Sequence, residues 1–205
     1  STRMTSTANN DINCKCREKG RGDHSPRPFS CPSIRSELFG QLRDDLEQIA
    51  DAEITYLEGY LWDPPAAKEA FLKAADAAHQ AGRKVSLSLS DPFCVDRHRE
   101  DFLDLAEHHV DILFANEEEI MTLYQVENFN DALQAVRSHC DVAALTRSEK
   151  GSVVVSGDEV HIVDAEVVDT LVDTTGAGDA YAAGFLFGLA SGRDLATSAR
   201  IGGIA

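Results

Sequence analysis

The chain has 205 residues, of which 43% are hydrophobic and 26% are charged, enough for one domain with a buried core. The 19 Lys and Arg residues against 35 Asp and Glu residues give a formal net charge of −16, which argues against a basic surface that binds DNA or RNA. No stretch approaches about 18 consecutive apolar residues, and the first residues lack the apolar core of a signal peptide. The sequence therefore predicts a cytoplasmic protein with neither nucleic acid nor membrane as a partner.

Composition and charge divide the chain near residue 40. Residues 1–40 contain seven Lys or Arg and four Asp or Glu, a balance of +3, which leaves −19 for residues 41–205. Residues 1–35 are rich in Ser, Arg, Pro and Gly and have no helical or strand period, so we expect a disordered or non-homologous segment there. Residues 36–205 form the predicted folded core.

Alternating strands and helices are predicted along this core. Leu38, Leu42, Leu46 and Ile49 share one helical face and predict a first helix. A strand at 54–57 precedes an Ala-rich helix, for which we expect Asp63 as the N-cap, Pro64 as the first helical residue and Gly82 as the stop. The same order continues through strand 84–89, helix 96–108, strand 111–115, helices 117–124 and 130–139, and strand 142–146.

The last third of the chain adds a hairpin and two helices. The β-branched runs 152–155 and 160–163 predict the hairpin, and 167–169 an extended approach to a Gly-rich turn. A small-residue helix should follow to about residue 190, and a final helix should begin near Asp194. Strands that alternate with helices pair in parallel, so the predicted fold class is α/β, with a mainly parallel sheet and helices on both faces.

The five cysteines show neither the even number nor the repeated spacing of a disulfide framework. Cys14, Cys16 and Cys31 could be a partial metal site, but a fourth ligand at a regular spacing is lacking. We expect free thiols at all positions, Cys14, Cys16, Cys31, Cys94 and Cys140.

A Gly-rich turn at the start of the helix near residue 177 carries the strongest chemical signal. The backbone amides of Gly176, Ala177 and Gly178 can hold an anion, which the helix dipole also favours. Asp179 falls in the first helical turn, where it could take a proton from an alcohol held against this cradle. The alternative is that Asp179 is only a favourable N-terminal charge and that the glycines only permit a tight turn.

Residues 173–186 resemble the C-terminal signature of the PfkB/ribokinase family of carbohydrate kinases across all 14 positions. This resemblance implies a ribokinase-like three-layer α/β/α sandwich. It also implies that Asp179 is the catalytic base that deprotonates the acceptor hydroxyl, while Gly176, Ala177 and Gly178 form an anion hole for the transferring γ-phosphate. Asp173 and Thr175 match the half of the signature that helps to bind a monovalent cation, such as K⁺, in many relatives.

Two further stretches fit the same family. Asn116 to Glu119 resembles its N-x-x-E motif, which implies that Asn116 and Glu119 organise Mg²⁺ through water; the alternative is an acidic helix N-terminus capped by Asn116. Residues 146–151 resemble its T-x-G-x-x-G loop, which implies that Thr146 and Gly151, together with Gly178, bind the nucleotide. Ser148 stands where the family often has glycine.

Segments 58–65, 90–95 and 114–117 look most like the adenosine-kinase branch of the family. The resemblance therefore implies an enzyme, an ATP- and Mg²⁺-dependent phosphotransferase that acts on a small-molecule substrate. Adenosine, phosphorylated to AMP with release of ADP, is the expected acceptor. Other acceptors of such carbohydrate kinases, namely ketodeoxygluconate, fructose or ribose, remain alternatives.

The resemblance covers residues 45–205 and has no counterpart for the family's N-terminal strands, its lid or its C-terminal helices. We therefore expect an incomplete sandwich that lacks the N-terminal lid and has an uncovered sheet edge. A catalytically inert kinase fragment is the alternative function. In the complete protein, the lid of the family could mediate a homodimer.

Overall fold

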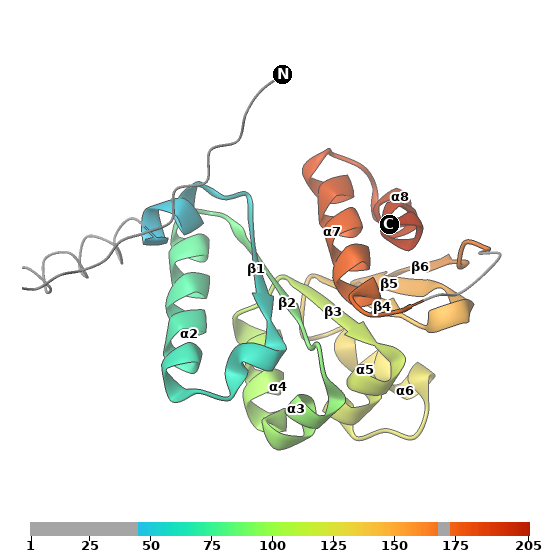
Figure 1. Ribbon diagram of the computed structural model, residues 1–205, viewed down its shortest axis with the longest axis horizontal. Coiled ribbons are helices and arrows are strands. Elements are labelled where there is room, and N and C mark those ends of the chain that lie inside the picture. The colour runs from blue at the N-terminus through green and yellow to red at the C-terminus, as the bar shows by residue number, and fades with distance from the viewer. Residues whose placement is uncertain (1–44, 168–172) are drawn as a thin grey trace, which may run out of the picture.

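The computed structural model describes residues 45–167 and 173–205, which form a three-layer arrangement around one sheet (Figure 1). The predicted segment 1–35, with Cys14, Cys16 and Cys31, lies outside the described residues, as do most of the first predicted helix and positions 168–169 of the extended approach. Residues 45–51 are helical, which agrees with the predicted helix around Leu46 and Ile49. None of the described helices is both long enough and apolar enough to span a membrane.

The sheet has six strands in the order β1-β2-β3-β4-β5-β6. The first four are parallel, and the last two form the predicted antiparallel hairpin. Their bounds are Ile54–Glu58 for β1, Lys84–Ser88 for β2, Ile112–Asn116 for β3, Val142–Thr146 for β4, Ser152–Ser156 for β5 and Glu159–Val163 for β6. The expected mainly parallel sheet is confirmed, and β1 is an edge strand without a further partner strand among the described residues.

The helices cover both faces of the sheet, as predicted (Figure 1). Each parallel connection steps to the next strand in the same direction, and right-handed crossovers then place all the connecting helices on one face. These are α2 (Pro65–Gln80), α3 (Pro92–Arg97), α4 (Arg99–His108), α5 (Glu117–Tyr124) and α6 (Phe129–Val136). The opposite face carries α7 (Ala177–Ala190) and α8 (Leu195–Ile204), and a short 3-10 helix, η1 (Gly59–Trp62), follows β1.

Alternating strand residues supply one apolar core to each face. Leu87 and Leu113 belong to the core beneath α2 to α6, whereas Phe114 belongs to the core beneath α7 and α8. Phe185 of α7 is completely buried in this second core. The small residues of α7 let α8 approach closely, since a Cβ on Gly184 would lie 2.8 Å from the Cα of Gly202.

The predicted start of α2 is wrong by one position. Pro64 is the N-cap, with φ −71° and ψ 134°, and Pro65 is the first helical residue. A residue before proline is driven out of the α region, so Pro65 forces Pro64 to stay extended. Asp63 is instead the C-cap residue of η1; its carboxylate accepts a hydrogen bond from Arg97 at 3.1 Å and contacts the His98 ring at 2.8 Å.

The predicted helix 96–108 is in fact two helices. Asp91 starts α3 early because its carboxylate accepts hydrogen bonds from the amides of Phe93 and Cys94 at 3.0 and 3.2 Å. The chain then leaves helical geometry at His98, with φ −123° and ψ 28°, before α4 begins. The predicted helix 130–139 ends earlier, at Val136.

Other local predictions are confirmed. Gly82 ends α2 with φ +68°, and its amide donates to His79 O at 2.9 Å. Asp194 caps α8 through the amide of Thr197 at 2.7 Å. Cys94 and Cys140 are free thiols.

Candidate active site

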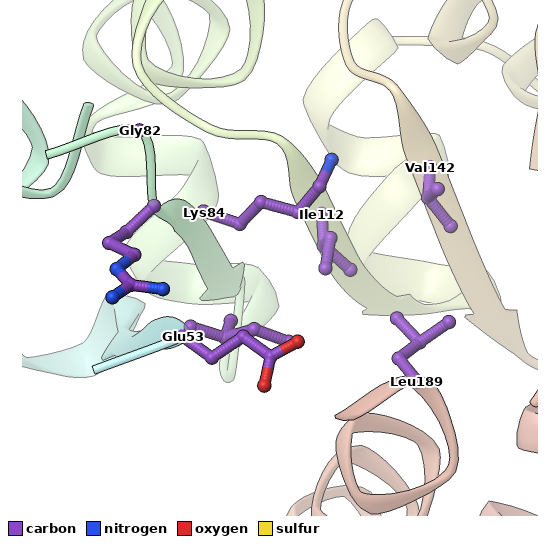
Figure 2. A pocket seen from close by; sticks show the side chains of 8 residues that line it. Glu53, Gly82, Lys84, Ile112, Val142 and Leu189 are labelled. Atoms are coloured by element: carbon purple, nitrogen blue, oxygen red, sulfur yellow. The ribbon is translucent and has the colours of Figure 1, made fainter. Parts of the chain in front are cut away.

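The candidate site lies where the parallel strands end and α7 begins. Figure 2 shows Leu189, near the far end of α7, beside Ile112 and Val142, the first residues of β3 and β4. These residues line a hollow of about 390 Å³ at the amino ends of the strands. The last turn of α7 thus lies at the amino ends of the strands. The first turn of α7, with Asp179, therefore lies toward their carboxyl ends. Ligands bind at this edge in open α/β sheets.

The start of α7 is open to an anion. Gly176 is the N-cap with φ +76°, and no side chain of residues 45–167 or 173–205 caps the helix. A Cβ on Gly176 or on Gly178 would meet no atom of the described residues within 4 Å, so these residues leave room beside the turn. The amide of Ala177 donates to Thr174 O at 3.0 Å, which leaves the Gly178 amide without a capping acceptor among the described residues. The Ala177 amide of the predicted cradle is therefore already engaged, and the role of Gly176, Ala177 and Gly178 as an anion hole stays a prediction.

Asp179 is exposed in the first turn of α7. Its negative charge acts on two tyrosines of the first strand and its following turn, Tyr56 and Tyr60. Hydrogen bonding with Glu58 is the main reason why the pKa of Tyr60 is raised, and the charge of Asp179 adds a smaller effect. The structure thus brings Asp179 to the end of β1, a neighbour that the sequence pattern did not predict.

Asp173 and Thr175 lie together just before α7. The Asp173 carboxylate accepts hydrogen bonds from the Thr175 amide at 2.9 Å and from its hydroxyl at 2.8 Å. The Thr175 amide is the main reason why the pKa of Asp173 is lowered. Both residues offer oxygen atoms, the ligand type that alkali cations prefer, and their role in cation binding stays a prediction.

Asn116 and Glu119 form a complete capping box at the start of α5. The Glu119 carboxylate accepts from the Asn116 amide at 2.9 Å and from its side-chain Nδ2 at 2.7 Å, while Asn116 Oδ1 accepts from the Glu119 amide at 2.9 Å. Glu119 is only 5% exposed, and burial raises its pKa.

This geometry matches the alternative interpretation, in which Asn116 caps the helix. Both carboxylate oxygens of Glu119 accept a hydrogen bond, so the pair fits Mg²⁺ only through intervening water, as the resemblance implies. In the ranges 45–167 and 173–205, no three His, Cys, Asp or Glu side chains are grouped so that they could hold a metal ion. The role of Asn116 and Glu119 toward Mg²⁺ stays a prediction.

The predicted nucleotide loop follows β4. Thr146 pairs with Asn116 across the parallel strands, so the two motifs are adjacent. The loop closes through a 2.8 Å hydrogen bond from the Arg147 amide to Gly151 O. Ser148 has φ +52°, so it adopts the left-handed conformation that the family's glycine would favour. Ser148 therefore replaces the family's glycine without changing the left-handed conformation of the turn.

An ion pair joins the two motifs, and the sequence analysis missed it. Arg147 donates to Glu117 through Nε at 3.1 Å and through Nη2 at 2.9 Å, and Lys150 adds a contact of 3.4 Å. The Arg147 guanidinium also lies 4.0 Å from the Phe129 ring centroid. Hydrogen bonding from Arg147 is the main reason why the pKa of Glu117 is lowered. Opposite charges directly after two consecutive parallel strands were the signal that could have revealed the pair.

Exposed aromatic side chains lie beside the same edge. Tyr60 is 54% exposed on η1, and Phe93 is 75% exposed on α3, two elements that contact one another. Leu61 is also largely exposed on η1. Large apolar side chains that are grouped on the surface often mark a binding site, and sequence pattern alone did not single these out.

Comparison with known proteins supports a kinase fold. Residues 29–205 match the family model described as pfkB family carbohydrate kinase. The chain is 51% identical to the crystal structure of adenosine kinase from Sinorhizobium meliloti, with a TM-score of 0.77, over 78% of this chain and 49% of that one. It is 50% identical to a probable sugar kinase from Rhizobium etli, with the same TM-score and coverage.

More distant relatives agree. A cytidine kinase from Thermococcus kodakarensis is 34% identical over 106 residues, which are 51% of this chain and 38% of that protein. Arabidopsis thaliana ribokinase, at 23% identity and a TM-score of 0.62 over 79% of this chain and 51% of that one, shows that the fold is ribokinase-like. The chain thus spans about half the length of the solved relatives, and its match covers 38% of the cytidine kinase.

Proposed function

Because the chain belongs to the PfkB family of carbohydrate kinases, we propose that this protein transfers the γ-phosphate of ATP to a hydroxyl of a nucleoside or sugar. The observation that carries the proposal is the start of α7, where Asp179 stands beside an uncapped, glycine-lined helix end at the carboxyl edge of the sheet. A carboxylate beside an anion cradle is what phosphoryl transfer to an alcohol requires. The alternative interpretation, a merely favourable N-terminal charge, does not need the open space in front of the turn.

The chemistry divides between the base and the cradle. ATP supplies the phosphoryl group, and Mg²⁺ neutralises its charge when both are bound. The Asp179 carboxylate accepts the proton of the acceptor hydroxyl, whose oxygen then attacks phosphorus in line as the bond to the ADP oxygen breaks. The Gly178 amide and the α7 dipole stabilise the negative charge of the transferring group.

The loops after β3 and β4 form the proposed nucleotide side. Thr146 and Gly151 bind the nucleotide within a loop that Glu117 holds through Arg147. Asn116 and Glu119 would hold Mg²⁺ through water molecules. Adjacency of these loops across the paired strands supports the assignment, because one nucleotide can then touch both.

Asp173 and Thr175 would hold a monovalent cation, such as K⁺, beside the cradle. Their oxygen atoms already lie together before α7, which supports the assignment. A cation there would place positive charge close to the transferring phosphate.

Adenosine is the acceptor that we propose, with its 5′-hydroxyl directed to Asp179. The exposed rings of Tyr60 and Phe93 support a planar base, which could stack on them, over a simple sugar. Similarity to an adenosine kinase also supports adenosine, whereas similarity to a probable sugar kinase supports a sugar as the alternative acceptor. The proposal also includes a cytoplasmic location, and a homodimer in the complete protein.

The experiment is a coupled ADP-release assay with Mg·ATP and adenosine, ribose, fructose or ketodeoxygluconate. We expect transfer to adenosine and a loss of about 10²- to 10⁴-fold in turnover for Asp179→Asn, with ATP binding retained. Asp76→Asn, an exposed carboxylate on α2, is the matched control and should keep full activity. Turnover of Asp179→Asn near that of the control would refute the assignment. A folded chain that binds ATP but phosphorylates no acceptor would identify it as an inert part of a kinase.

A further inference from the structure

One polar atom beside the candidate base lacks a partner. The hydroxyl of Tyr56 is buried and makes no hydrogen bond within the described part of the chain. A buried polar group without a partner is uncommon in a folded protein and calls for an explanation. Its neighbours, therefore, identify what the hydroxyl could bind.

The position of Tyr56 in the sheet directs its side chain toward α7. Tyr56 lies on the same face of β1 as Ile54, which belongs with it to the core beneath α7 and α8. Across the strand pair, Glu58 lies beside Ser88, two residues further along on this face. The Ser88 side chain, which acts on the Tyr56 hydroxyl, therefore lies on the carboxyl-terminal side of Tyr56, toward the candidate site.

An aromatic cluster holds the Tyr56 ring relative to α7. The ring packs edge-on against Phe114 of β3, with the centroids 6.3 Å apart. Phe114 in turn packs edge-on against Phe185 at 5.5 Å and Tyr181 at 6.5 Å, both on α7. Because Phe114 is buried, it couples the place of the Tyr56 ring to the first turns of α7, where Asp179 lies.

The groups that act on the hydroxyl are Ser88, Asp179 and Glu58. Burial raises the pKa of Tyr56 to about 12; the Ser88 side chain opposes this effect, and the charges of Asp179 and Glu58 add to it. The phenol is therefore protonated at neutral pH and can donate a hydrogen bond. An exposed aspartate in a first helical turn can rotate to accept it.

We propose that Tyr56 is a positioning residue whose hydroxyl donates a hydrogen bond to the Asp179 carboxylate and orients it toward the acceptor hydroxyl. One carboxylate oxygen accepts from Tyr56, and the other remains free to take the proton of the acceptor alcohol. Without this contact the exposed Asp179 side chain would sample several rotamers, of which few face the acceptor. The inference deepens the proposed function and rests on it for its catalytic meaning, whereas the contact itself is tested without activity.

The chain contains four tyrosines, and the contact is tested by NMR after these are labelled with ¹³C at Cζ. Tyr56→Phe assigns the Tyr56 signal. Asp179→Asn should shift this signal, while the matched control Asp173→Asn, whose carboxylate accepts from Thr175, should leave it in place. The proposal is overturned if Asp179→Asn has no effect, or if only Glu58→Gln or Ser88→Ala shifts the signal.

Kinetics then separates this inference from the proposed function. In the phosphotransfer assay, Tyr56→Phe should lower kcat roughly tenfold and leave the KM for Mg·ATP unchanged. Tyr181→Phe is the matched control because its hydroxyl is also buried and has no hydrogen-bond partner in the part of the chain that the structure describes, yet the side chain that acts on it is Ser152. If Asp179→Asn is inactive while Tyr56→Phe equals this control, the positioning role is wrong and the kinase assignment stands. Full activity of Asp179→Asn would instead refute the kinase assignment, with the NMR result still deciding the contact.

Discussion

Replacing Gly151 with alanine tests how tightly the loop after β4 is built. Gly151 has φ +80° and ψ −135°, a region that is open almost only to glycine. A Cβ placed there would lie 2.0 Å from Val163 O and 2.7 Å from the Ala165 amide nitrogen. Both contacts are backbone atoms, so no side-chain rotation could relieve them, and the end of β6 would have to move.

The expected loss of stability is the sum of two effects. Backbone strain at such a position costs about 1–3 kcal/mol, and overpacking against backbone costs about 1–3 kcal/mol more. Gly157→Ala is the matched control, since Gly157 has φ +54° but a Cβ there would meet nothing within 4 Å. This control should lose only about 1–2 kcal/mol, the cost of the left-handed conformation.

Urea unfolding measures both variants, with the slope m checked for a common unfolded state. Gly151→Ala should be less stable than Gly157→Ala by at least about 1 kcal/mol and should also bind Mg·ATP more weakly, since Gly151 closes the proposed nucleotide loop. Equal losses in the two variants would refute the argument, because the steric contact with Val163 would then have no measurable effect.

Two further predictions concern packing and pH. Gly202→Ala should be less stable in thermal unfolding than Gly203→Ala by about 1–3 kcal/mol, because a Cβ at Gly202 would lie 2.6 Å from Tyr181 O whereas one at Gly203 would meet nothing within 4 Å; equal midpoints would contradict close packing of α7 on α8. Hydrogen bonds from Lys68, and then from the Trp62 indole, lower the pKa of Asp101. These hydrogen bonds stabilise the folded state fully above the pKa that Asp101 has in the unfolded chain, about 4. The stabilisation is lost as the pH falls through the lower pKa that Asp101 has in the folded state. Wild type should therefore lose more stability than Asp101→Asn below about pH 4 in urea titrations, and parallel losses would disprove this role.

Local signals in the sequence were sufficient for most of the fold. The boundaries of α5 and β4 and the hairpin of β5 and β6 follow from hydrophobic period and turn residues, which act over a few neighbouring positions. The same holds for the stop at Gly82, where a left-handed residue is needed. These features survive in the tertiary structure because packing and local preference agree there.

Local errors arose where two signals competed. Asp63 is a good N-cap residue, yet the second of two consecutive prolines sets where α2 can begin. Asp91 caps a helix that starts before the periodic pattern becomes visible, so α3 and α4 were predicted as one helix. At Pro65 a backbone constraint overrode a weaker statistical preference, whereas at Asp91 a side-chain cap started the helix before the periodic pattern.

The sequence by itself determined the α/β class, the family resemblance and the glycine-rich start of the helix that carries Asp179. Only the tertiary structure decided which groups surround these residues. It placed Arg147 against Glu117 and the Tyr56 side chain in the core beneath α7 and α8. The reason is physical: a motif depends on backbone geometry over a few residues, whereas its neighbours depend on how distant strands align and how a helix packs across them.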